Sequence, residues 1–360
     1  MKTLLLGDVC PTEVTAPLFR KKNISELFND VVSLFDNKDF IFANLECALT
    51  EHDMEIKKFG PCLKGPIETA AVLKELGVDC CGLSNNHVFD YGIKGIRDTI
   101  QALSDVGIRF TGFGNNYADS RRNYTFENNG EKICVIAVCE HEYSYALEYR
   151  MGSRPYDEYD TIDDIRAAKA EHDRVIVIYH GGKEFSQYPS PRLHKLCHAM
   201  ARSGADVILC QHSHCIGCYE EYEGCHILYG QGNFHFVRPH PQECWRTALA
   251  VEYDTTENKI SFVPIKNNDH GISLASGSEK DEILEQFESR NQALINGGWK
   301  DGWRDFCESN KDVYIKTICR ACVADAKEYD NNKFAHFLDC EAHTDVWREL
   351  FPSYNLTNEI

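Results

Sequence analysis

One pattern repeats along the first 235 residues: a helix-forming stretch, a glycine, a continuous apolar run and a polar cluster. In the clearest copy, a helix expected over residues 66–76 ends at Gly77, and a strand expected over 78–83 leads into Ser-Asn-Asn-His. Apolar strands that alternate with helices are typical of a mostly parallel sheet that is buried on both faces. The pattern therefore predicts an α/β fold.

Further elements follow from the same reasoning. We expect helices over 93–106 and 193–203, strands over 40–43, 108–113, 174–179 and 206–210, a hairpin formed by 122–126 and 133–138, and additional strands within 218–236 and 247–266. Residues 140–160 show no clear period and predict a surface loop or lid. From residue 279 onward, acidic and basic residues recur in helical patterns. We therefore expect one domain over 1–278 and a helical C-terminal extension, packed on it, over 279–360.

Side chains that commonly bind metals follow five expected strands: the four over 40–43, 78–83, 174–179 and 206–210, and a short buried strand at the N-terminus that ends in a polar turn at Asp8. In open α/β sheets, ligands bind in the crevice beyond the carboxyl ends of the strands, so these side chains are expected to converge there. A mixture of carboxylates, an amide and imidazoles suits two adjacent first-row divalent ions. The predicted metal-binding set is Asp8, Glu46, Asn86, His180, His212 and His214.

The composition limits the partners and the compartment. The formal net charge of −18 opposes binding to a nucleic-acid backbone, although a bound cation would still let the site accept an anionic small molecule. No apolar stretch approaches the roughly 20 residues of a membrane helix, and the N-terminal apolar run is too short for a signal peptide. The 17 cysteines suit a reducing cytosol, where free thiols pack as small apolar side chains. We expect a cytoplasmic protein without membrane insertion.

Six motifs occur in an order that resembles the capsule-synthesis (CapA-type, poly-γ-glutamate capsule) family, a branch of the calcineurin-like metallophosphatases. They are Gly7-Asp8, Asn44-Leu45-Glu46, the run from Asn85 to Gly92 (Asn-Asn-His-Val-Phe-Asp-Tyr-Gly), His180-Gly181-Gly182-Lys183-Glu184, His212-Ser213-His214 and Gly232-Asn233-Phe234. The resemblance covers about residues 1–240. It implies a four-layer metallophosphatase-like βαβ sandwich, to which the helical C-terminal extension would be added.

The resemblance also implies roles for individual residues. Glu46 would bridge two metal ions, with Asn86, His180 and His212 completing one ion and Asp8 and His214 holding the other. His87 would be the general acid or an electrostatic stabiliser, oriented by Asp90. The expected cofactors are one or two divalent ions; manganese, iron or zinc suit the donors best, and magnesium or calcium are compatible.

The chain departs from the classical metallophosphatase pattern at its first motif. Cys10 stands where those enzymes carry a histidine, so it would either ligate a metal as a thiolate or pack as a buried structural cysteine. The bridging position holds Glu46 in place of an aspartate, and Gln211 replaces the glycine before the His-x-His motif. These changes leave the reaction type open.

Four residues near the motifs are candidates for substrate binding: Lys58, Asn85, Glu184 and Asn233. Lys58 would grip an anionic group or belong to a solvated basic loop. Glu184 would orient a metal-binding histidine or be a surface charge, and Asn233 would bind substrate or form a turn. Glu140-His141-Glu142 would reach the substrate from the lid. No role is predicted for His194 or His198.

Together these features predict a metal-dependent, phosphoesterase-like hydrolase in capsule or surface-polymer biosynthesis. Its substrate would be an anionic small molecule or polymer precursor. One alternative keeps the metals but uses them on a carbonyl, as in an isomerase, an epimerase or an amide-acting enzyme. Another is a non-catalytic subunit that binds a precursor in a capsule-synthesis complex and docks through its C-terminal helices. The sequence does not decide the oligomeric state.

Overall fold

The computed structural model describes residues 1–140 and 143–352. Its first large sheet has the strand order β17-β16-β15-β1-β2-β5-β6. Strands β1, β2, β5 and β6 run parallel, and β15, β16 and β17 extend the sheet antiparallel from β1. Their bounds are β1 Lys2–Val9, β2 Phe40–Leu45, β5 Cys80–Gly82, β6 Arg109–Thr111, β15 Thr247–Asp254, β16 Lys259–Asn267 and β17 Ile272–Leu274.

The second large sheet has the order β13-β14-β12-β11-β9-β8. Its four central strands are parallel, and the edge strands β13 and β8 are antiparallel to their neighbours. The bounds are β8 Tyr124–Asn128, β9 Glu131–Cys139, β11 Arg174–His180, β12 Val207–Gln211, β13 Tyr219–Tyr222 and β14 Cys225–Leu228. Two small pairs also form: β3 (Ala48–Leu49) with β4 (Lys64–Gly65), and β7 (Phe113–Gly114) with β10 (Gly152–Ser153).

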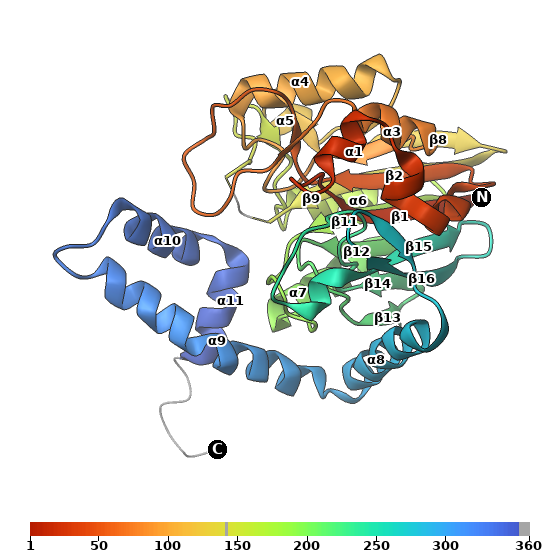
Figure 1. Ribbon diagram of the computed structural model, residues 1–360. Coiled ribbons are helices and arrows are strands. Elements are labelled where there is room, and N and C mark those ends of the chain that lie inside the picture. The colour runs from red at the N-terminus through yellow and green to blue at the C-terminus, as the bar shows by residue number, and fades with distance from the viewer. Residues whose placement is uncertain (141–142, 353–360) are drawn as a thin grey trace.

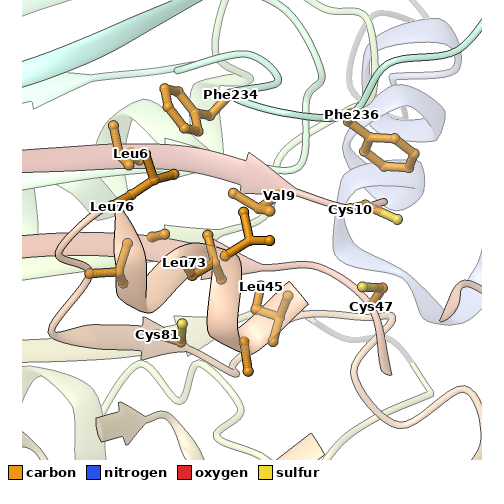
Figure 2. Packing of buried hydrophobic residues seen from close by; sticks show 14 of the residues in the cluster. Leu6, Val9, Cys10, Leu45, Cys47, Leu73, Leu76, Cys81, Phe234 and Phe236 are labelled. Atoms are coloured by element: carbon orange, nitrogen blue, oxygen red, sulfur yellow. The ribbon is translucent and has the colours of Figure 1, made fainter. Parts of the chain in front are cut away.

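The two large sheets pack face to face and are covered by helices on their outer faces. Leu5 and Phe42 of the first sheet share one buried cluster with Val135 and Ile176 of the second. The outer face of the first sheet carries α1 Ala16–Arg20, α2 Ile24–Phe28, the 3-10 helix Asn29–Phe35, α3 Thr69–Glu75 and α4 Gly92–Asp105, and that of the second carries α6 Asp160–Glu171 and α7 Pro191–Arg202. Figure 2 shows part of the apolar cluster between the first sheet and the helices that cover it. The predicted four-layer α/β sandwich is confirmed.

Local signals explain several helix boundaries. Ser190 caps α7 by accepting a hydrogen bond from the backbone N–H of Leu193, and Pro191 follows at the first helical position. Gly77 and Gly107 follow α3 and α4 with φ of +86° and +74°, a conformation that glycine adopts without strain. Both therefore end their helices as predicted.

The segment predicted as one strand over 108–113 is divided into β6 and β7. Gly112, with φ of +83°, separates them, and a Cβ at this glycine would lie 2.6 Å from that of Ser84. The chain thus turns away from the first sheet, and β7 pairs with β10 instead. Helix α5 (Tyr117–Ser120) contacts β7 and β10, and the 3-10 helix Glu243–Arg246 directly precedes β15. The predicted loop over 140–160 is partly ordered by β10, and residues 141 and 142 lie outside the described residues.

The C-terminal region is helical, as predicted. It consists of α8 Gly277–Asn296, α9 Trp299–Ala321, α10 Glu328–Asp339 and α11 Glu341–Leu350. Helices α9, α10 and α11 form a separate buried cluster, and Figure 1 shows them gathered at the end of the sandwich opposite the N-terminus. We call these three helices the cap. The division into domains at residue 278 stays a prediction.

Within the described part of the chain, none of the helices is both long enough and apolar enough to cross a membrane.

Candidate metal centre

The predicted metal-binding residues come together at the carboxyl ends of strands from both sheets. Asp8 lies near the end of β1, where the pairing with β2 shifts register, and Glu46 directly follows β2. Asn86 and His87 lie in the loop after β5. From the second sheet, His180 ends β11, and His212 and His214 follow β12. All seven residues are buried.

Two groups of potential metal donors share one residue. Glu46, His180 and His212 form one group, and Asp8, Glu46 and His214 form the other. In each group, the donor atoms all lie within 4.8 Å of one another. A carboxylate common to two groups is the arrangement that a bridging ligand between two ions requires.

The Glu46 carboxylate carries unsatisfied buried atoms. Neither of its oxygens forms a hydrogen bond with the described residues, although His180 Nε2 lies 3.3 Å from Oε1. The same His180 nitrogen lies 3.0 Å from Asn86 Oδ1, and His212 Nδ1 likewise has no hydrogen-bond partner within residues 1–140 and 143–352. Burying an unpaired carboxylate is costly unless a cation compensates for the lost hydration. These residues therefore fit divalent metal ions.

Burial disfavours the charged form of every ionisable member of the centre. It raises the pKa of Asp8 to about 7, with a further contribution from Glu46, and raises the pKa of Glu46 well above its ordinary value. It lowers the pKa of His180 to about 4 and that of His214 to about 3. Neutral imidazoles are the form that binds metals, and bound cations would allow both carboxylates to ionise.

The His-x-His segment has an unusual backbone. His212 and His214 adopt φ of +80° and +55°, values that L-residues rarely adopt. Asp8 accepts a hydrogen bond from the His212 backbone N–H, at 3.2 Å. Backbone strain of this kind concentrates at functional sites, where the surrounding structure enforces it.

Two asparagines support the centre. The Asn44 side-chain amide donates to Asp8 Oδ1 at 2.7 Å and lies 3.2 Å from His180 Nδ1. The Asn233 amide oxygen lies 2.8 Å from His214 Nδ1. Such contacts orient the side chains that hold a metal. Asn233 therefore positions His214, and its contact with substrate stays a prediction. Asn44 belongs to a quoted motif, but the sequence pattern did not predict its role.

His87 and Asp90 form the pair that the sequence predicts. His87 Nδ1 lies 2.7 Å from Asp90 Oδ2, and the other Asp90 oxygen accepts from Lys58. Lys58 Nζ also lies 3.2 Å from His87 Nδ1. Burial and the Lys58 ammonium lower the pKa of His87 to about 4, whereas Asp90 opposes this shift. Asp90 and Lys58 thus act on the same imidazole in opposite directions.

A cavity of about 560 Å³ adjoins the centre. Asn86, His87 and His212 line it from the sandwich, and Tyr314, Lys333 and His343 line it from the cap. Tyr314 and His343 are joined by a hydrogen bond of 2.7 Å between the Tyr314 hydroxyl and His343 Nδ1. The cap therefore lies over the site and contributes to the cavity wall, a role that the sequence did not predict.

The remaining substrate candidates have different surroundings. Lys58 and Glu184 line the cavity, and Lys58 is at the same time ion-paired with Asp90. Asn85 is fully buried; its amide donates to the Leu45 carbonyl and accepts from the N–H groups of His87 and Val88. These bonds hold the loop after β5 in place, and substrate binding by Asn85 stays a prediction.

Cys10 packs in the apolar cluster beside Phe236 and near Cys47 (Figure 2). Burial, with a contribution from Cys47, raises the pKa of the Cys10 thiol well above its ordinary value. Among the described residues, its sulfur belongs to none of the donor groups. The structure therefore favours the buried structural cysteine over the thiolate ligand.

Glu140 also differs from its predicted role at the lid. It is buried and accepts hydrogen bonds from the Tyr179 hydroxyl, the Gly182 N–H and Arg192. Glu140 thus ties the end of β9 to α7, while His141 and Glu142 lie outside the described residues.

Comparison with known proteins agrees with the motif order. Residues 2–238 match the family described as "Bacterial capsule synthesis protein PGA_cap". The "Capsule biosynthesis protein CapA" of Bacillus anthracis is 29% identical over 286 residues, which are 77% of this chain and 68% of the relative. The "PGA biosynthesis protein CapA" of Bacillus subtilis (strain 168) is 28% identical over 305 residues, 82% of this chain and 78% of the relative.

A "Probable polyglutamine synthesis accessory protein" of Mycobacterium tuberculosis is 26% identical over 240 residues, covering 62% of this chain and 63% of the relative. The resemblance drawn from the motifs is thereby confirmed. Since the family match spans well over half of its length, the chain belongs to the bacterial capsule synthesis protein (PGA_cap) family.

Proposed function

We propose that the chain is a metal-dependent hydrolase of the phosphoesterase type that acts in capsule or surface-polymer biosynthesis. The observation that carries the proposal is Glu46, whose two buried oxygens accept no hydrogen bond from the described residues while the residue belongs to both donor groups. The printed names of the relatives support the capsule context. A cytoplasmic location is part of the proposal.

Each residue of the centre then has a physical role. Asp8, Glu46, Asn86, His180, His212 and His214 would hold one or two divalent ions. Such ions supply Lewis-acid polarisation of a phosphoryl oxygen and an activated water. His87, fixed by Asp90, lines the cavity and would exchange a proton with the leaving oxygen. Asn44 and Asn233 would keep the ligands in position.

The cavity supports an anionic substrate. Lys183, with a side chain that is 12% exposed, lines the cavity together with Lys58 and Lys333. Glu184 contributes one opposing charge at the same wall. Because the cap forms the far wall, the cavity favours a small molecule or the end of a polymer precursor over the middle of a long chain.

The test is hydrolysis by the manganese-loaded protein of p-nitrophenyl phosphate, bis-p-nitrophenyl phosphate and γ-glutamyl-p-nitroanilide. The proposal predicts turnover of a phosphoester that His87→Ala lowers about 10²–10⁴-fold. His270→Ala, at an exposed histidine, is the matched control and should retain full activity.

Other outcomes distinguish the alternatives. Turnover of γ-glutamyl-p-nitroanilide alone would show that the site acts on amides and not on phosphoesters. Solvent deuterium entering a peptide or glycan without bond cleavage would identify an isomerase or epimerase. If the loaded protein turned over none of these substrates but still bound capsule precursors, the hydrolase proposal would fail in favour of a binding subunit.

A further inference from the structure

A second cluster of metal-binding side chains lies outside the centre, between α7 and β13. His194 and His198 are four residues apart on α7, which places both rings on one face of the helix, and their centroids are 4.1 Å apart. Their Nε2 atoms lie 3.5 and 2.7 Å from the same oxygen of Glu220 on β13. One donor atom from each residue falls within 4.8 Å of the others.

The cluster is held rigidly. The His198 ring stacks on Tyr222 with centroids 3.7 Å apart, and the His194 ring stacks on Trp299 at 4.7 Å. The Tyr229 hydroxyl donates to Glu220 Oε1 at 2.7 Å, which fixes the carboxylate. The three side chains are between 16% and 22% exposed, so solvent ions can reach donors that are already oriented.

Hydrogen bonding does not fully account for this arrangement. Glu220 Oε1 already accepts from Tyr229 and lies 2.7 Å from His198 Nε2, so the approach of His194 Nε2 to the same oxygen adds a third polar neighbour at 3.5 Å. Two imidazoles and a carboxylate that converge on one point match the donors of a zinc site. None of the three residues lines the cavity beside Glu46.

We propose that His194, His198 and Glu220 form a separate binding site for one zinc ion. A water molecule would complete the four-coordinate geometry that zinc prefers. Imidazole and carboxylate donors together select zinc over calcium or magnesium, which prefer sets made of oxygen alone.

The location assigns the ion a structural role. It would join α7 to the edge strand β13 and fix the His194 ring, on which Trp299 packs. Trp299 is the first residue of α9, the first helix of the cap. Zinc at this site would therefore stabilise the base of the cap without contacting substrate.

The experiment counts zinc in full-length protein that carries His212→Ala and His214→Ala, so that the main centre is impaired. After removal of metal by a chelator and dialysis against micromolar zinc, we expect about one equivalent by elemental analysis. Adding His194→Ala and His198→Ala should remove it, whereas adding His270→Ala should not. Glu220→Gln, which preserves the shape of the side chain, should weaken zinc binding at least about 10-fold.

Two further measurements distinguish loss of the zinc site from misfolding of a variant. Cobalt in place of zinc should give the visible absorption of a tetrahedral site, and zinc should raise the Tm of the His212→Ala, His214→Ala protein but not that of the Glu220→Gln version. The proposal is overturned if the folded parent variant binds no zinc at micromolar concentration. It is equally overturned if binding persists unchanged after the substitutions at His194, His198 and Glu220.

Discussion

Asp90 contacts His87 and Lys58 with different oxygens: Oδ2 lies 2.7 Å from His87 Nδ1, and Oδ1 accepts from the Lys58 ammonium. The two neighbours shift the pKa of His87 in opposite directions, because the Lys58 charge lowers it and the Asp90 charge raises it. Asp90 is therefore a positioning residue with a measurable electrostatic effect.

Replacing Asp90 and replacing Lys58 should shift the pH profile of activity in opposite directions. Asp90→Asn removes the charge that favours the imidazolium, so the limb of the profile set by His87 should move to lower pH. Lys58→Met should move the same limb to higher pH. The profile of kcat/KM against pH measures both. Shifts in the same direction, or identical profiles, would contradict the arrangement.

Removing the charge of Glu46 should stabilise the metal-free protein. Burial raises the pKa of Glu46, so above pH 4.5 the unfolded chain releases a proton that the metal-free fold retains. Stability therefore falls as the pH rises above that value. Glu46→Gln should remove the part of this slope that Glu46 contributes and raise the free energy of unfolding at pH 8 by about 1–3 kcal/mol.

The same Glu46→Gln variant should behave oppositely when metal is present. It loses the bridging carboxylate, so manganese should raise the Tm of the wild-type protein and have little effect on the variant. Thermal unfolding with and without a chelator measures both the stability of the metal-free protein and its stabilisation by manganese. A variant that manganese stabilises as much as the wild type would show that Glu46 is not a ligand. A variant that is less stable than the wild type without metal would contradict the cost of burying the Glu46 charge.

The cap should affect substrate binding more than the chemical step. Tyr314 and His343 line the cavity and are hydrogen-bonded to each other. We expect Tyr314→Phe and His343→Gln to raise KM about 10-fold, a loss of about 1.4 kcal/mol, with a smaller change in kcat and no change in metal content. Lys316→Ala, at a side chain of α9 that is 76% exposed, is the control. Unchanged KM in both cavity variants would remove the cap from the substrate site.

A buried ion network fastens the cap to the sandwich. Arg192 on α7 contacts Glu140 after β9 and, through Nε, lies 2.9 Å from Asp345 Oδ2 on α11. Arg192→Gln would leave the buried Glu140 carboxylate without its cation, and Asp345 would keep only the exposed Arg348, 3.5 Å away. We expect a loss of about 2–4 kcal/mol at pH 7, because a quarter of the Arg192 side chain remains exposed and lessens the penalty.

This loss should depend on pH. In the wild-type protein the pKa of Glu140 is lowered: burial raises it, but Arg192, Tyr179 and Gly182 together outweigh that effect. Its stabilising contribution is present above pH 4.5 and is lost as the pH falls through the lowered value. The difference between the two proteins in urea unfolding should therefore stay constant from pH 7 to pH 5 and shrink as the pH falls below 4.5. A difference that stayed constant below pH 4.5 as well would contradict the ion network.

The features that could be predicted from the sequence are those set by short segments of the chain, namely the strands and the residues that follow them. Five of the expected strands are followed by a ligand-type residue, so the convergence of Glu46, His180 and His212 followed from the parallel sheets that place those ends together. The cap could not be predicted in this way, because Tyr314 and His343 meet only through the packing of α9 against α11. Likewise, nothing local to Asn233 shows that its amide reaches His214.

The central claim is that Glu46 bridges divalent metal ions, and anomalous X-ray diffraction tests it directly. Crystals grown with manganese would be measured on both sides of the manganese absorption edge. The account predicts anomalous peaks at the Glu46 carboxylate, one beside His180 and His212 and one beside Asp8 and His214. An ordered centre without an anomalous peak at Glu46 would contradict it.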